Sequence, residues 1–361
     1  KHQELALNEI NTSFETHDIS LLHGVTSSGK TEIYVKKIEA IIAQGKQVLY
    51  LVPEIALTSQ LVQRLEQYFG NQIAVYHSRY SQNERLEVWN HVLNNSSSAR
   101  VVIGARSSVL LPFQDLGLII IDEEHEQSYK QFDPAPRYHA RDAAIVLGNM
   151  FNAKILLGTA TPSLETYYNA SESKYGLVEI TKRYNNVMMP EIELVDLKEK
   201  YKKKKMINHF SDRLITEIKE TLQLGSQVIL FQNRRGYSPV VSCNTCGHTP
   251  DCPNCDVSLT FHQYRNQLRC HYCSYMMSMQ TSCGACGGLE INSKGFGTEQ
   301  IQEEIELLFP NAKVARMDLD TTRGKHSYDR IISSFENKEV DILVGTQMVT
   351  KGLDFRFVKL V

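Results

Sequence analysis

The stretch that decides the fold is Gly24-Val-Thr-Ser-Ser-Gly-Lys-Thr31, which follows the apolar segment Leu21–His23 and opens a helical pattern at Lys30. A G-x-x-x-x-G-K-T pattern between a strand and a helix is typical of a phosphate-binding loop. The glycines let main-chain N–H groups surround phosphate oxygens, and the helix N-terminus adds the positive end of its dipole. The alternative is a glycine-rich turn with a chance lysine, which the flanking strand and helix disfavour.

Each position of this loop has an expected role in holding a nucleotide. The Lys30 ammonium is expected to reach the β- and γ-phosphates of ATP, and the Thr31 hydroxyl is expected to bind Mg²⁺. Main-chain groups supply the other contacts. The predicted nucleotide-binding set is Gly24, Val25, Thr26, Ser27, Ser28, Gly29, Lys30 and Thr31.

A second polar group, Asp122-Glu-Glu-His125, directly follows the apolar strand Leu118–Ile121. A carboxylate at the end of a buried strand lies beside the phosphate loop in this architecture and holds Mg²⁺. We therefore expect Asp122 to bind magnesium together with Thr31, and Glu123 to polarise the attacking water. The predicted catalytic set is Lys30, Asp122 and Glu123. A solvated acidic turn is the alternative, and the upstream phosphate loop argues against it.

Short apolar strands alternate with helical patterns along most of the chain, which indicates parallel sheets covered on both faces. In the first half, strands are predicted at Leu21–His23, Gln47–Val52, Ile73–Tyr76, Val101–Ile103, Leu118–Ile121 and Ile155–Leu157. Helices are predicted at Lys30–Ala43, after Pro53 and after the capping box Ser81-x-x-Glu84. In the second half, helices are predicted at Ser211–Leu222, Thr298–Leu308 and Ser327–Asn337, with strands at Gln227–Phe231, Lys313–Met317 and Asp341–Val344.

The composition is that of an ordinary globular protein. The chain has 361 residues, 42% of them hydrophobic and 22% charged, with a formal net charge of −2. These values exclude wholesale disorder and a histone-like polycation, and the length suggests two or three domains of about 150 residues. The apolar runs fall short of the ~20 residues of a membrane span, so no membrane partner is expected. The cysteine usage described below indicates a reducing compartment and predicts a cytoplasmic protein. The abrupt ends, Lys1 and the apolar run Phe357–Val361, predict a piece of a longer protein.

All eight cysteines lie in four Cys-x-x-Cys pairs between Cys243 and Cys286, which is metal-ligand spacing in a reducing compartment. Each pair offers two thiolates to a tetrahedral ion, so two structural Zn²⁺ sites are expected. Four pairs allow three partitions, and the sequence favours the nested one. The inner spacing resembles a zinc ribbon, and both outer pairs read Cys-x-x-Cys-Gly. The predicted sets are Cys243, Cys246, Cys283 and Cys286 for zinc 1, and Cys252, Cys255, Cys270 and Cys273 for zinc 2.

Other residues allow two interpretations. The aromatic residues of the cysteine segment either form its small core or stack on unpaired bases, and its histidines are not expected to bind metal. These residues are Phe261, Tyr264, Tyr272, Tyr275, His248, His262 and His271, beside Arg265 and Arg269. The polar loop Glu126–Asp142 either senses DNA or packs on its own aromatic residues. Basic residues near it are Arg106, Lys130, Arg137 and Arg141. The run Lys202–Lys205 is interpreted as a solvated loop.

The motifs and their order along the chain resemble those of superfamily 2 helicases. Besides the phosphate loop and Asp122–His125, the motifs concerned are Gly158-Thr-Ala-Thr-Pro-Ser163 and Val344–Phe355, which is similar to the fifth helicase motif. Val52–Thr58 and Gly104–Phe113 resemble the motifs of that family that contact the DNA backbone. The cysteine insert in the second half narrows the resemblance to the PriA family of replication-restart helicases, which implies the same nested zinc pairing.

The resemblance implies an α/β fold of two RecA-like parallel-sheet lobes, with a cysteine-rich double-zinc module inserted in the second lobe. Expected boundaries are 1–185 for lobe 1, 186–210 for a linker, 211–240 and 291–361 for a truncated lobe 2, and 241–290 for the insert. The implied activity is ATP-dependent 3′-to-5′ DNA unwinding at branched DNA such as stalled forks, leading to primosome assembly and replication restart. Implied partners are DNA, single-strand DNA-binding protein and helicase-loading proteins; the implied cofactors are ATP, Mg²⁺ and two Zn²⁺.

Two other functions are compatible with the sequence. One is a non-enzymatic assembly platform, in which the zinc module docks proteins and the nucleotide site acts as a switch. The other is an RNA helicase, which the cysteine insert disfavours. The chain ends before the sixth helicase motif, so its sequence names no arginine that completes ATP hydrolysis.

Overall fold

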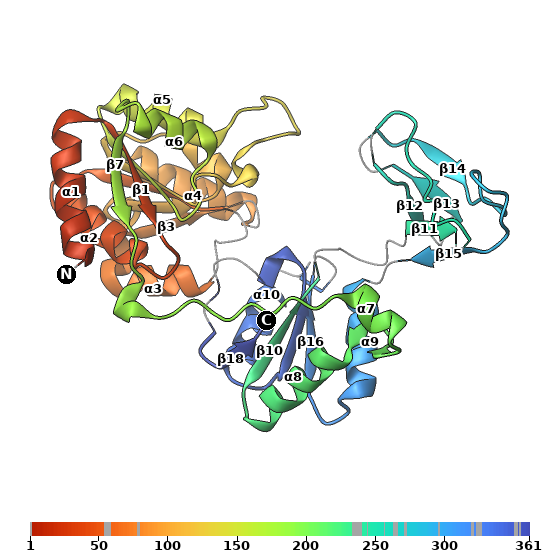
Figure 1. Ribbon diagram of the computed structural model, residues 1–361. Helices are drawn as coiled ribbons and strands as arrows, with labels where there is room; N and C mark the ends of the chain where they lie inside the picture. Colours follow the sequence, from red (N-terminus) through yellow and green to blue (C-terminus); the bar gives the residue numbers. More distant parts are fainter. Residues whose placement is uncertain are drawn as a thin grey trace. The chain divides into compact units, whose positions relative to one another are not determined.

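The computed structural model describes residues 2–53, 59–77, 80–232, 240–243, 245–255, 257–262, 266–270, 273–294, 297–318, 321–322, 327–349, 353 and 355–361. Within it the chain divides into two compact units, Lys1–Ile192 and Glu193–Val361. Figure 1 labels many of the elements named below, and each unit is described by itself.

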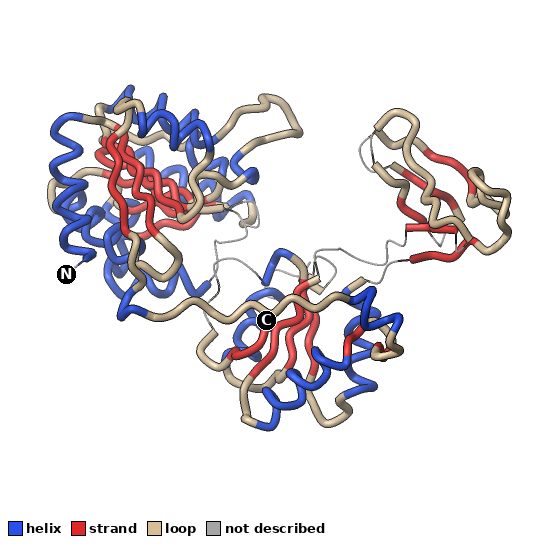
Figure 2. Tube along the Cα trace, viewed as in Figure 1, coloured by secondary structure: helices blue, strands red, loops and turns tan. Residues whose placement is uncertain are grey.

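Unit 1 is built on a seven-stranded sheet, whose strands are red in Figure 2, and every pairing in it is parallel. The strand order is β3-β4-β2-β5-β6-β1-β7. The strands are β1 (Ile19–Gly24), β2 (Gln47–Leu51), β3 (Ile73–Tyr76), β4 (Val101–Gly104), β5 (Leu116–Asp122), β6 (Lys154–Thr159) and β7 (Gly176–Ile180). Since the strands are parallel, the segments that follow β1, β5 and β6 all leave the sheet at its carboxyl edge.

Helices cover both faces of this sheet. Alternate residues of the strands point to opposite sides, so Leu118 and Ile120 join one core while Ile119 and Ile121 join the other. The first core is closed by α1 (His2–Thr16), α2 (Lys30–Ile42) and α3 (Ser59–Phe69). The second core is closed by α4 (Gln82–Leu93), α5 (Ala140–Phe151) and α6 (Leu164–Ser171).

The predicted parallel sheet of the first half is confirmed, with several additions. The structure adds α1, α5, α6 and the edge strand β7, together with short 3₁₀ turns at Gly70–Gln72, Ser97–Ala99, Arg106–Leu110, Gln127–Tyr129 and Tyr184–Asn186. The predicted capping box is present, because the Ser81 hydroxyl accepts from the Glu84 N–H and the Glu84 carboxylate accepts from the Ser81 N–H. The polar loop is shorter than expected, since α5 already begins at Ala140.

Unit 2 contains a second parallel sheet, with the order β16-β17-β10-β18. Its strands are β10 (Gln227–Phe231), β16 (Val314–Met317), β17 (Ile342–Gly345) and β18 (Val358–Leu360). One face packs against α8 (Asp212–Gln223) and α9 (Thr298–Leu308), and the other packs against α10 (Ser327–Glu336). A further 3₁₀ turn lies at Gln347–Val349. The predicted elements of this half are present within one or two residues, and the apolar run at the end of the chain forms β18.

The predicted linker 186–210 has secondary structure of its own. It contains α7 (Leu197–Lys202) and β8 (Met206–Ile207), which pairs with β9 (Phe210–Ser211). The Asp196 carboxylate caps α7 by accepting from the N–H groups of Lys198 and Glu199. Side chains of Lys202–Lys205 are exposed, in agreement with a solvated segment. The exact domain boundaries stay a prediction.

The cysteine segment of unit 2 is an antiparallel sheet with the order β14-β13-β12-β11-β15. Its strands are β11 (Val240–Cys243), β12 (Thr260–His262), β13 (Gln267–Arg269), β14 (Met276–Ser278) and β15 (Ile291–Lys294). Val241, Leu259 and Leu268 form its own small core, against which Phe261 and Tyr275 pack. These two aromatic side chains therefore take the core role that the sequence allowed. Across the described residues, no helix is long and apolar enough to span a bilayer.

Candidate nucleotide site and metal centres

The loop after β1 has the geometry of a phosphate-binding loop. Gly29 has φ +83°, a left-handed conformation that favours glycine, and it directly precedes α2. The Lys30 Nζ donates to the Gly24 carbonyl across the loop at 2.8 Å. The Ser28 hydroxyl is buried and has no hydrogen-bond partner in the described part of the chain. A loop with an inward lysine and an unsatisfied buried hydroxyl fits a bound anion.

A residue that sequence reasoning missed, Gln3 on α1, touches this loop. Its side-chain amide donates to the main-chain carbonyls of Ser28 and Gly29 at 3.5 and 3.4 Å. A Cβ on Gly29 would lie 1.7 Å from the Gln3 amide nitrogen, so this contact also requires glycine. An adjoining cavity of about 220 Å³ is lined by His2, Gln3, Ser28, Lys182, Arg183, Tyr184 and Asn185. No local sequence pattern marks Gln3, because its partner lies 25 residues away.

Asp122 ends β5 at the carboxyl edge of the sheet, and its carboxylate accepts hydrogen bonds from three donors. The Tyr34 hydroxyl lies 3.0 Å from Oδ1, the Tyr50 hydroxyl lies 3.4 Å from Oδ2, and the Glu123 N–H also donates to Oδ1. Burial, together with the neighbouring Glu123 carboxylate, raises the pKa of Asp122 to about 6. A partly buried carboxylate at this edge suits a divalent cation, which would compensate its charge.

Glu123 is held in a left-handed conformation, with φ +47°. Its carboxylate accepts from the Thr159 hydroxyl at 3.4 Å, and the same hydroxyl lies 2.8 Å from the His125 Nδ1. Thr159 ends β6, the strand next to β5. The predicted catalytic base is therefore linked by side-chain contacts to the segment Gly158–Ser163.

Glu124 makes a second link to that segment, through a network around its buried carboxylate. Its side chain is 0% exposed and pairs with Arg141 at 2.9 Å. The carboxylate also accepts from the Ser163 N–H, the Ser163 hydroxyl and the Thr166 hydroxyl at 2.7, 3.0 and 2.8 Å. This network joins the end of β5, the first turn of α5 and the start of α6.

Three of the four basic side chains considered for DNA contact have internal partners. Arg106 donates to the carbonyls of Ser128 and Lys130, and Lys130 donates to the Arg137 carbonyl. Arg141 was expected in a loop but lies on α5 and pairs with Glu124. Of the aromatic residues of the loop, Tyr129 is buried, Tyr138 packs on the core, and Phe132 is 67% exposed. The structure thus favours self-packing for most of this loop.

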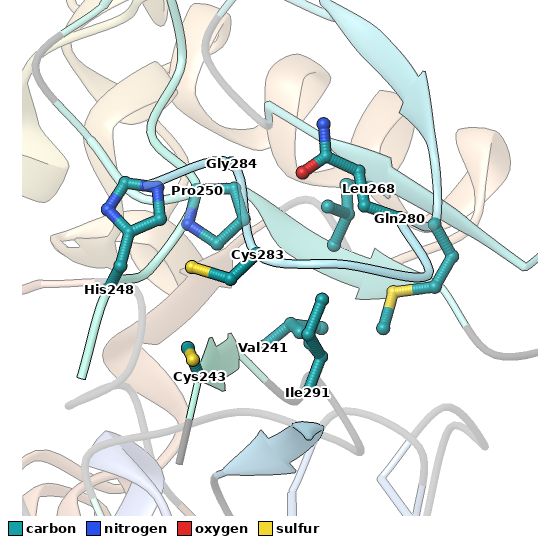
Figure 3. Close-up of a pocket in the computed structure, with 10 residues that line it drawn as sticks. Val241, Cys243, His248, Pro250, Leu268, Gln280, Cys283, Gly284 and Ile291 are labelled. Atoms are coloured by element: carbon teal, nitrogen blue, oxygen red, sulfur yellow. The ribbon is translucent and has the colours of Figure 1, made fainter. Parts of the chain in front are cut away.

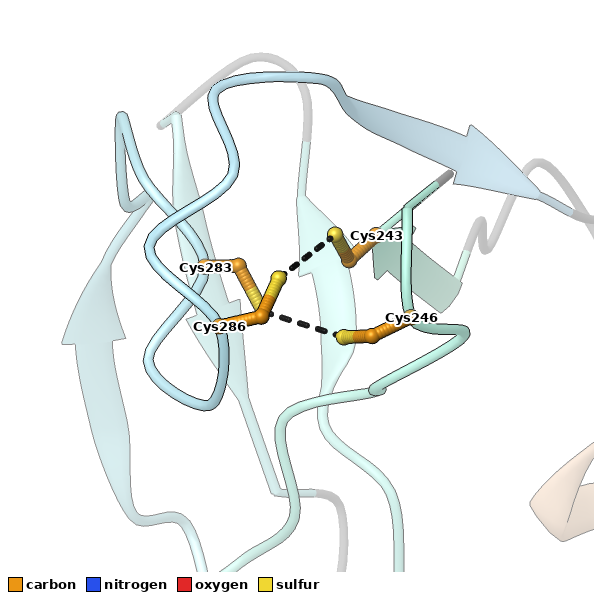
Figure 4. A group of neighbouring side chains, drawn as sticks. All are labelled: Cys243, Cys246, Cys283 and Cys286. Atoms are coloured by element: carbon orange, nitrogen blue, oxygen red, sulfur yellow. Dashed lines mark hydrogen bonds between the residues drawn. The ribbon is translucent and has the colours of Figure 1, made fainter.

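The structure brings together the same two sets of thiols that the nested prediction groups. In the outer set, Cys243 lies 3.6 Å from Cys286 and Cys246 lies 3.7 Å from Cys283, measured between Sγ atoms (Figure 4). A tetrahedral ion with Zn–S bonds of about 2.3 Å separates its sulfur ligands by about 3.8 Å. The spacing therefore fits zinc and exceeds a disulfide bond of about 2 Å. The main-chain N–H of Cys246 lowers the pKa of the Cys243 thiol to about 6, which favours the thiolate that binds metal.

The inner set is formed by Cys252, Cys255, Cys270 and Cys273, with 3.4 Å between the sulfur atoms of Cys252 and Cys273. All four Sγ atoms lie within 4.8 Å of one another. The neighbouring Cys273 thiol raises the pKa of Cys255 to about 12. Thiols crowded in this way resist losing their protons until a cation compensates the negative charge, which fits a divalent ion at the centre.

The space beside the outer thiols is small. A cavity of about 10 Å³ lies between Cys243, Cys283 and the apolar side chains Val241, Leu268 and Ile291 (Figure 3). This volume is at the lower limit for one water molecule. His248 is exposed and lies in neither thiol cluster, as expected. Each set offers four cysteine ligands, the number that fills a tetrahedral structural zinc site.

Comparisons with known proteins agree with these features. Residues 1–170 match the family of DEAD/DEAH box helicases, and residues 252–277 match the cysteine-rich region domain of PriA DNA helicase. The replication restart protein PriA of Bacillus subtilis is 45% identical over 347 residues, which are 96% of this chain and 43% of the relative. The chain belongs to the PriA family.

Other PriA proteins are also similar to this chain over nearly its whole length. Those of Haemophilus influenzae and Chlamydia pneumoniae are 43% and 41% identical, over 100% and 99% of this chain. The chain covers 48% of each of these two relatives, so it spans about half the length of the PriA proteins it matches.

Solved structures support the helicase fold at low sequence identity. RecG bound to a three-way DNA junction matches with a TM-score of 0.55 and 16% identity, covering 99% of this chain and 37% of that protein. The helicase MrfA bound to DNA matches with a TM-score of 0.54 and 15% identity, covering 98% of this chain and 43% of that protein. Two parallel-sheet units of helicase type with a PriA-like cysteine module are thus confirmed.

Several predicted positions lie outside the described residues. They include residues 54–58 of the segment Val52–Thr58, and Thr350–Gly352 and Asp354 of the fifth-motif segment. The structure therefore places only parts of these two segments. Tyr264, Arg265, His271 and Tyr272 of the cysteine module also lie outside the described residues, as does the side chain of His262.

Proposed function

We propose that this chain is the motor part of an ATP-driven DNA helicase that moves 3′ to 5′ on branched DNA and starts primosome assembly at stalled forks. The observation that supports this most is the meeting of Lys30, Asp122 and Glu123 at one sheet edge in a chain of the PriA family. The relatives named above are replication restart proteins. The direction of movement and the preference for forks rest on the family relationship alone.

The residues at the sheet edge suit ATP hydrolysis. The loop Gly24–Thr31 would hold the triphosphate, with Lys30 on its outer phosphates, and Asp122 and Thr31 would hold Mg²⁺. Bound Mg²⁺ would neutralise charge that develops on the phosphate oxygens. Glu123 would orient and polarise water beside the γ-phosphate, and Thr159 and His125 keep its carboxylate in place. The cavity beside Ser28, lined by Gln3 and Tyr184, would take the base.

The contacts of the Asp122–His125 segment suggest how hydrolysis reaches the rest of the motor. Glu123, Glu124 and His125 all contact residues between Thr159 and Thr166. A change at the phosphate end of the site would therefore shift the segment after β6 directly. We infer that this segment transmits nucleotide state, as the helicase resemblance implies.

The remaining expectations form part of the same proposal. The two Cys₄ clusters would bind two structural Zn²⁺ ions and stiffen a module that presents a surface to DNA or to protein partners. Single-strand DNA-binding protein and helicase-loading proteins are the partners expected from the family. Reduced thiols and a role in replication would suit a cytoplasmic protein.

The test is ATP hydrolysis by the full-length protein, with and without forked DNA, beside Lys30→Ala. We expect strong stimulation by forks in the wild type and a loss of at least ~100-fold in kcat in Lys30→Ala, because the phosphates lose their main cation. A matched control is Lys46→Ala, a lysine just before β2 and outside the loop, which should hydrolyse ATP normally. Hydrolysis that does not respond to DNA would instead favour a nucleotide-switched assembly platform. Stronger stimulation by RNA would favour an RNA helicase.

A further inference from the structure

Two tyrosines converge on the proposed magnesium carboxylate from different elements. Tyr34 lies on α2, one turn after Lys30, and Tyr50 lies on β2. Their rings pack edge to face with 5.6 Å between centroids. The hydroxyl of Tyr34 reaches Oδ1 of Asp122, and the hydroxyl of Tyr50 reaches Oδ2. Each carboxylate oxygen is therefore bonded by one of the two rings.

Packing alone does not explain tyrosine at these positions. Both side chains are 0% exposed, and β2 is buried at every position. A phenylalanine would fill the same space without a hydroxyl that needs a buried partner. Both hydroxyls donate to Asp122, so the polar atoms of these residues serve the carboxylate rather than the core.

Gly158 provides a second, independent observation. It is the register partner of Asp122 on the neighbouring strand β6. A Cβ at Gly158 would lie 1.8 Å from the Tyr34 hydroxyl oxygen and 2.8 Å from the ring carbon that bears it. The Tyr34 hydroxyl therefore occupies the space that a side chain at Gly158 would fill. Glycine at this position leaves Tyr34 free to reach Asp122.

We propose that Tyr34 and Tyr50 are positioning residues that hold the Asp122 carboxylate in one orientation for the metal–nucleotide complex. A hydroxyl on each oxygen fixes rotation of the carboxylate. Each oxygen has two lone pairs, and because Oδ1 also accepts from the Glu123 N–H, the lone pair left for the water shell of the metal is on Oδ2. The inference rests on the proposed function, because Asp122 holds magnesium there. It adds two residues that the helicase motifs do not name.

The test compares nucleotide binding with and without Mg²⁺ in full-length protein. The variants are Tyr34→Phe, Tyr50→Phe and the double variant, and the probe is a fluorescent ADP analogue titrated in Mg²⁺ or in EDTA. We expect affinity in EDTA to stay within about twofold of wild type, since the phosphate loop is intact. The gain in affinity from Mg²⁺ should fall roughly 10- to 100-fold in the double variant, as for other groups that orient metal ligands. The Mg²⁺ concentration for half-maximal ATP hydrolysis should rise in parallel.

Tyr129→Phe is the matched control. This tyrosine is buried to the same degree and donates to the main-chain carbonyl of Asp122 at 2.7 Å, not to its carboxylate. Tyr129→Phe should lose thermal stability like the other variants. It should keep the wild-type increase in nucleotide affinity on addition of Mg²⁺. Gly158→Ala should reproduce the Tyr34→Phe result, because it displaces the hydroxyl without removing it.

Two outcomes would overturn the inference. If Tyr34→Phe and Tyr50→Phe melt at lower temperature but keep the wild-type gain from Mg²⁺, the hydroxyls are structural only. If the wild type binds nucleotide equally well in Mg²⁺ and in EDTA, and Lys30→Ala binds it as tightly as the wild type, the nucleotide does not bind at this site. The proposed function then fails together with the inference. The first result leaves the proposed function standing, so the two failures are distinguishable.

Discussion

Asp122 has a proton affinity that differs between the folded and unfolded chain. Its pKa of about 6 lies above the value of about 3.9 for an unfolded aspartate, chiefly because the carboxyl is buried. The folded state therefore binds the proton more tightly between about pH 4 and pH 6, and the slope of stability against pH is negative there. Stability from this group is fully present below about pH 4 and is lost as the pH rises through about 6.

Asp122→Asn should accordingly stabilise unit 1 at neutral pH, because the amide resembles the protonated carboxyl. We expect its melting temperature, without Mg²⁺ and nucleotide, to exceed that of wild type at about pH 7.5 by more than it does at about pH 4.5. ATP hydrolysis should be lost in the same variant. Differential scanning calorimetry at the two pH values measures the first effect. An equal difference at both pH values would contradict a raised pKa for the Asp122 carboxyl.

For single residues, the sequence predicted those site residues whose role depends on their neighbours along the chain. The phosphate loop and the Cys-x-x-Cys turns are local patterns, and their residues lie together as expected. Gln3, Tyr34 and Tyr50 could not be predicted, because their polar contacts join separate elements. A tyrosine in an apolar strand such as β2 is indistinguishable from a core residue until its hydroxyl partner is known.

Helix α5 is held near its start by polar contacts of one side chain, Arg141. Its N-terminus at His139 has no side-chain cap, and Arg141 in its first turn is tied to the buried Glu124. A buried carboxylate that loses its cation is strongly destabilising, whereas an exposed ion pair contributes little. The network should therefore contribute to the stability of unit 1 as well as to signalling.

Arg141→Met should lower the free energy of unfolding of unit 1 by about 3 kcal/mol, because Glu124 stays buried without its partner. The double variant Glu124→Gln, Arg141→Met should recover part of this loss. Trp89, on α4 of unit 1, is the one tryptophan of the 361-residue sequence and reports unfolding in urea by its fluorescence. A loss below about 1 kcal/mol would indicate a pair that behaves like one at the surface.

Helix α5 is one of the elements that the sequence did not predict, for a physical reason. Exposed apolar side chains such as Val146 and Met150 blur its amphipathic pattern, and its start lacks a capping residue. The preceding segment contains Pro134 and Pro136, so the sequence pattern indicates a loop as far as Asp142. By contrast, the capping box marked the start of α4 at Ser81, and α9 has the predicted bounds Thr298–Leu308.

For the whole molecule, the cysteine module has a hydrophobic core of its own. The clusters that hold unit 1 share no residue with the core of the cysteine module, which is built around Val241, Leu259 and Leu268. With so few apolar residues, the module depends on its metal ions for folding. Loss of zinc should therefore unfold the module alone.

We expect two zinc ions per chain, and one in Cys255→Ser, by inductively coupled plasma mass spectrometry. A strong chelator applied to the wild type should expose the thiols to a colorimetric reagent while the urea midpoint reported by Trp89 stays unchanged. Cooperative loss of the Trp89 signal on chelation would show that unit 1 depends on the module. A single zinc in wild type would contradict the two clusters.

Alternating strands and helices were enough to predict two parallel-sheet units, but not the strand order β3-β4-β2-β5-β6-β1-β7. Strand order depends on which faces pack together after the chain folds, and a local pattern holds no such information. The insertion of the module between β10 and α9 was readable, because its cysteines interrupt an otherwise regular alternation.

The nested thiol sets have a consequence for how the insert is joined to the chain. The outer set takes two ligands from the first turns of the insert and two from the last, and β11 pairs with β15 next to it, so that Cys243 lies opposite Ile291. The chain therefore enters and leaves the insert at one place, where the outer thiol set and the β11–β15 pairing lie. A protease that cuts between the two inner pairs, such as near Gln267, would leave a nicked protein whose pieces stay joined by both thiol sets and by the pairing of β10 with β17 and β18. Because its two ends are fixed beside each other, residues could be added to or removed from the middle of the insert without changing the distance between its two points of attachment.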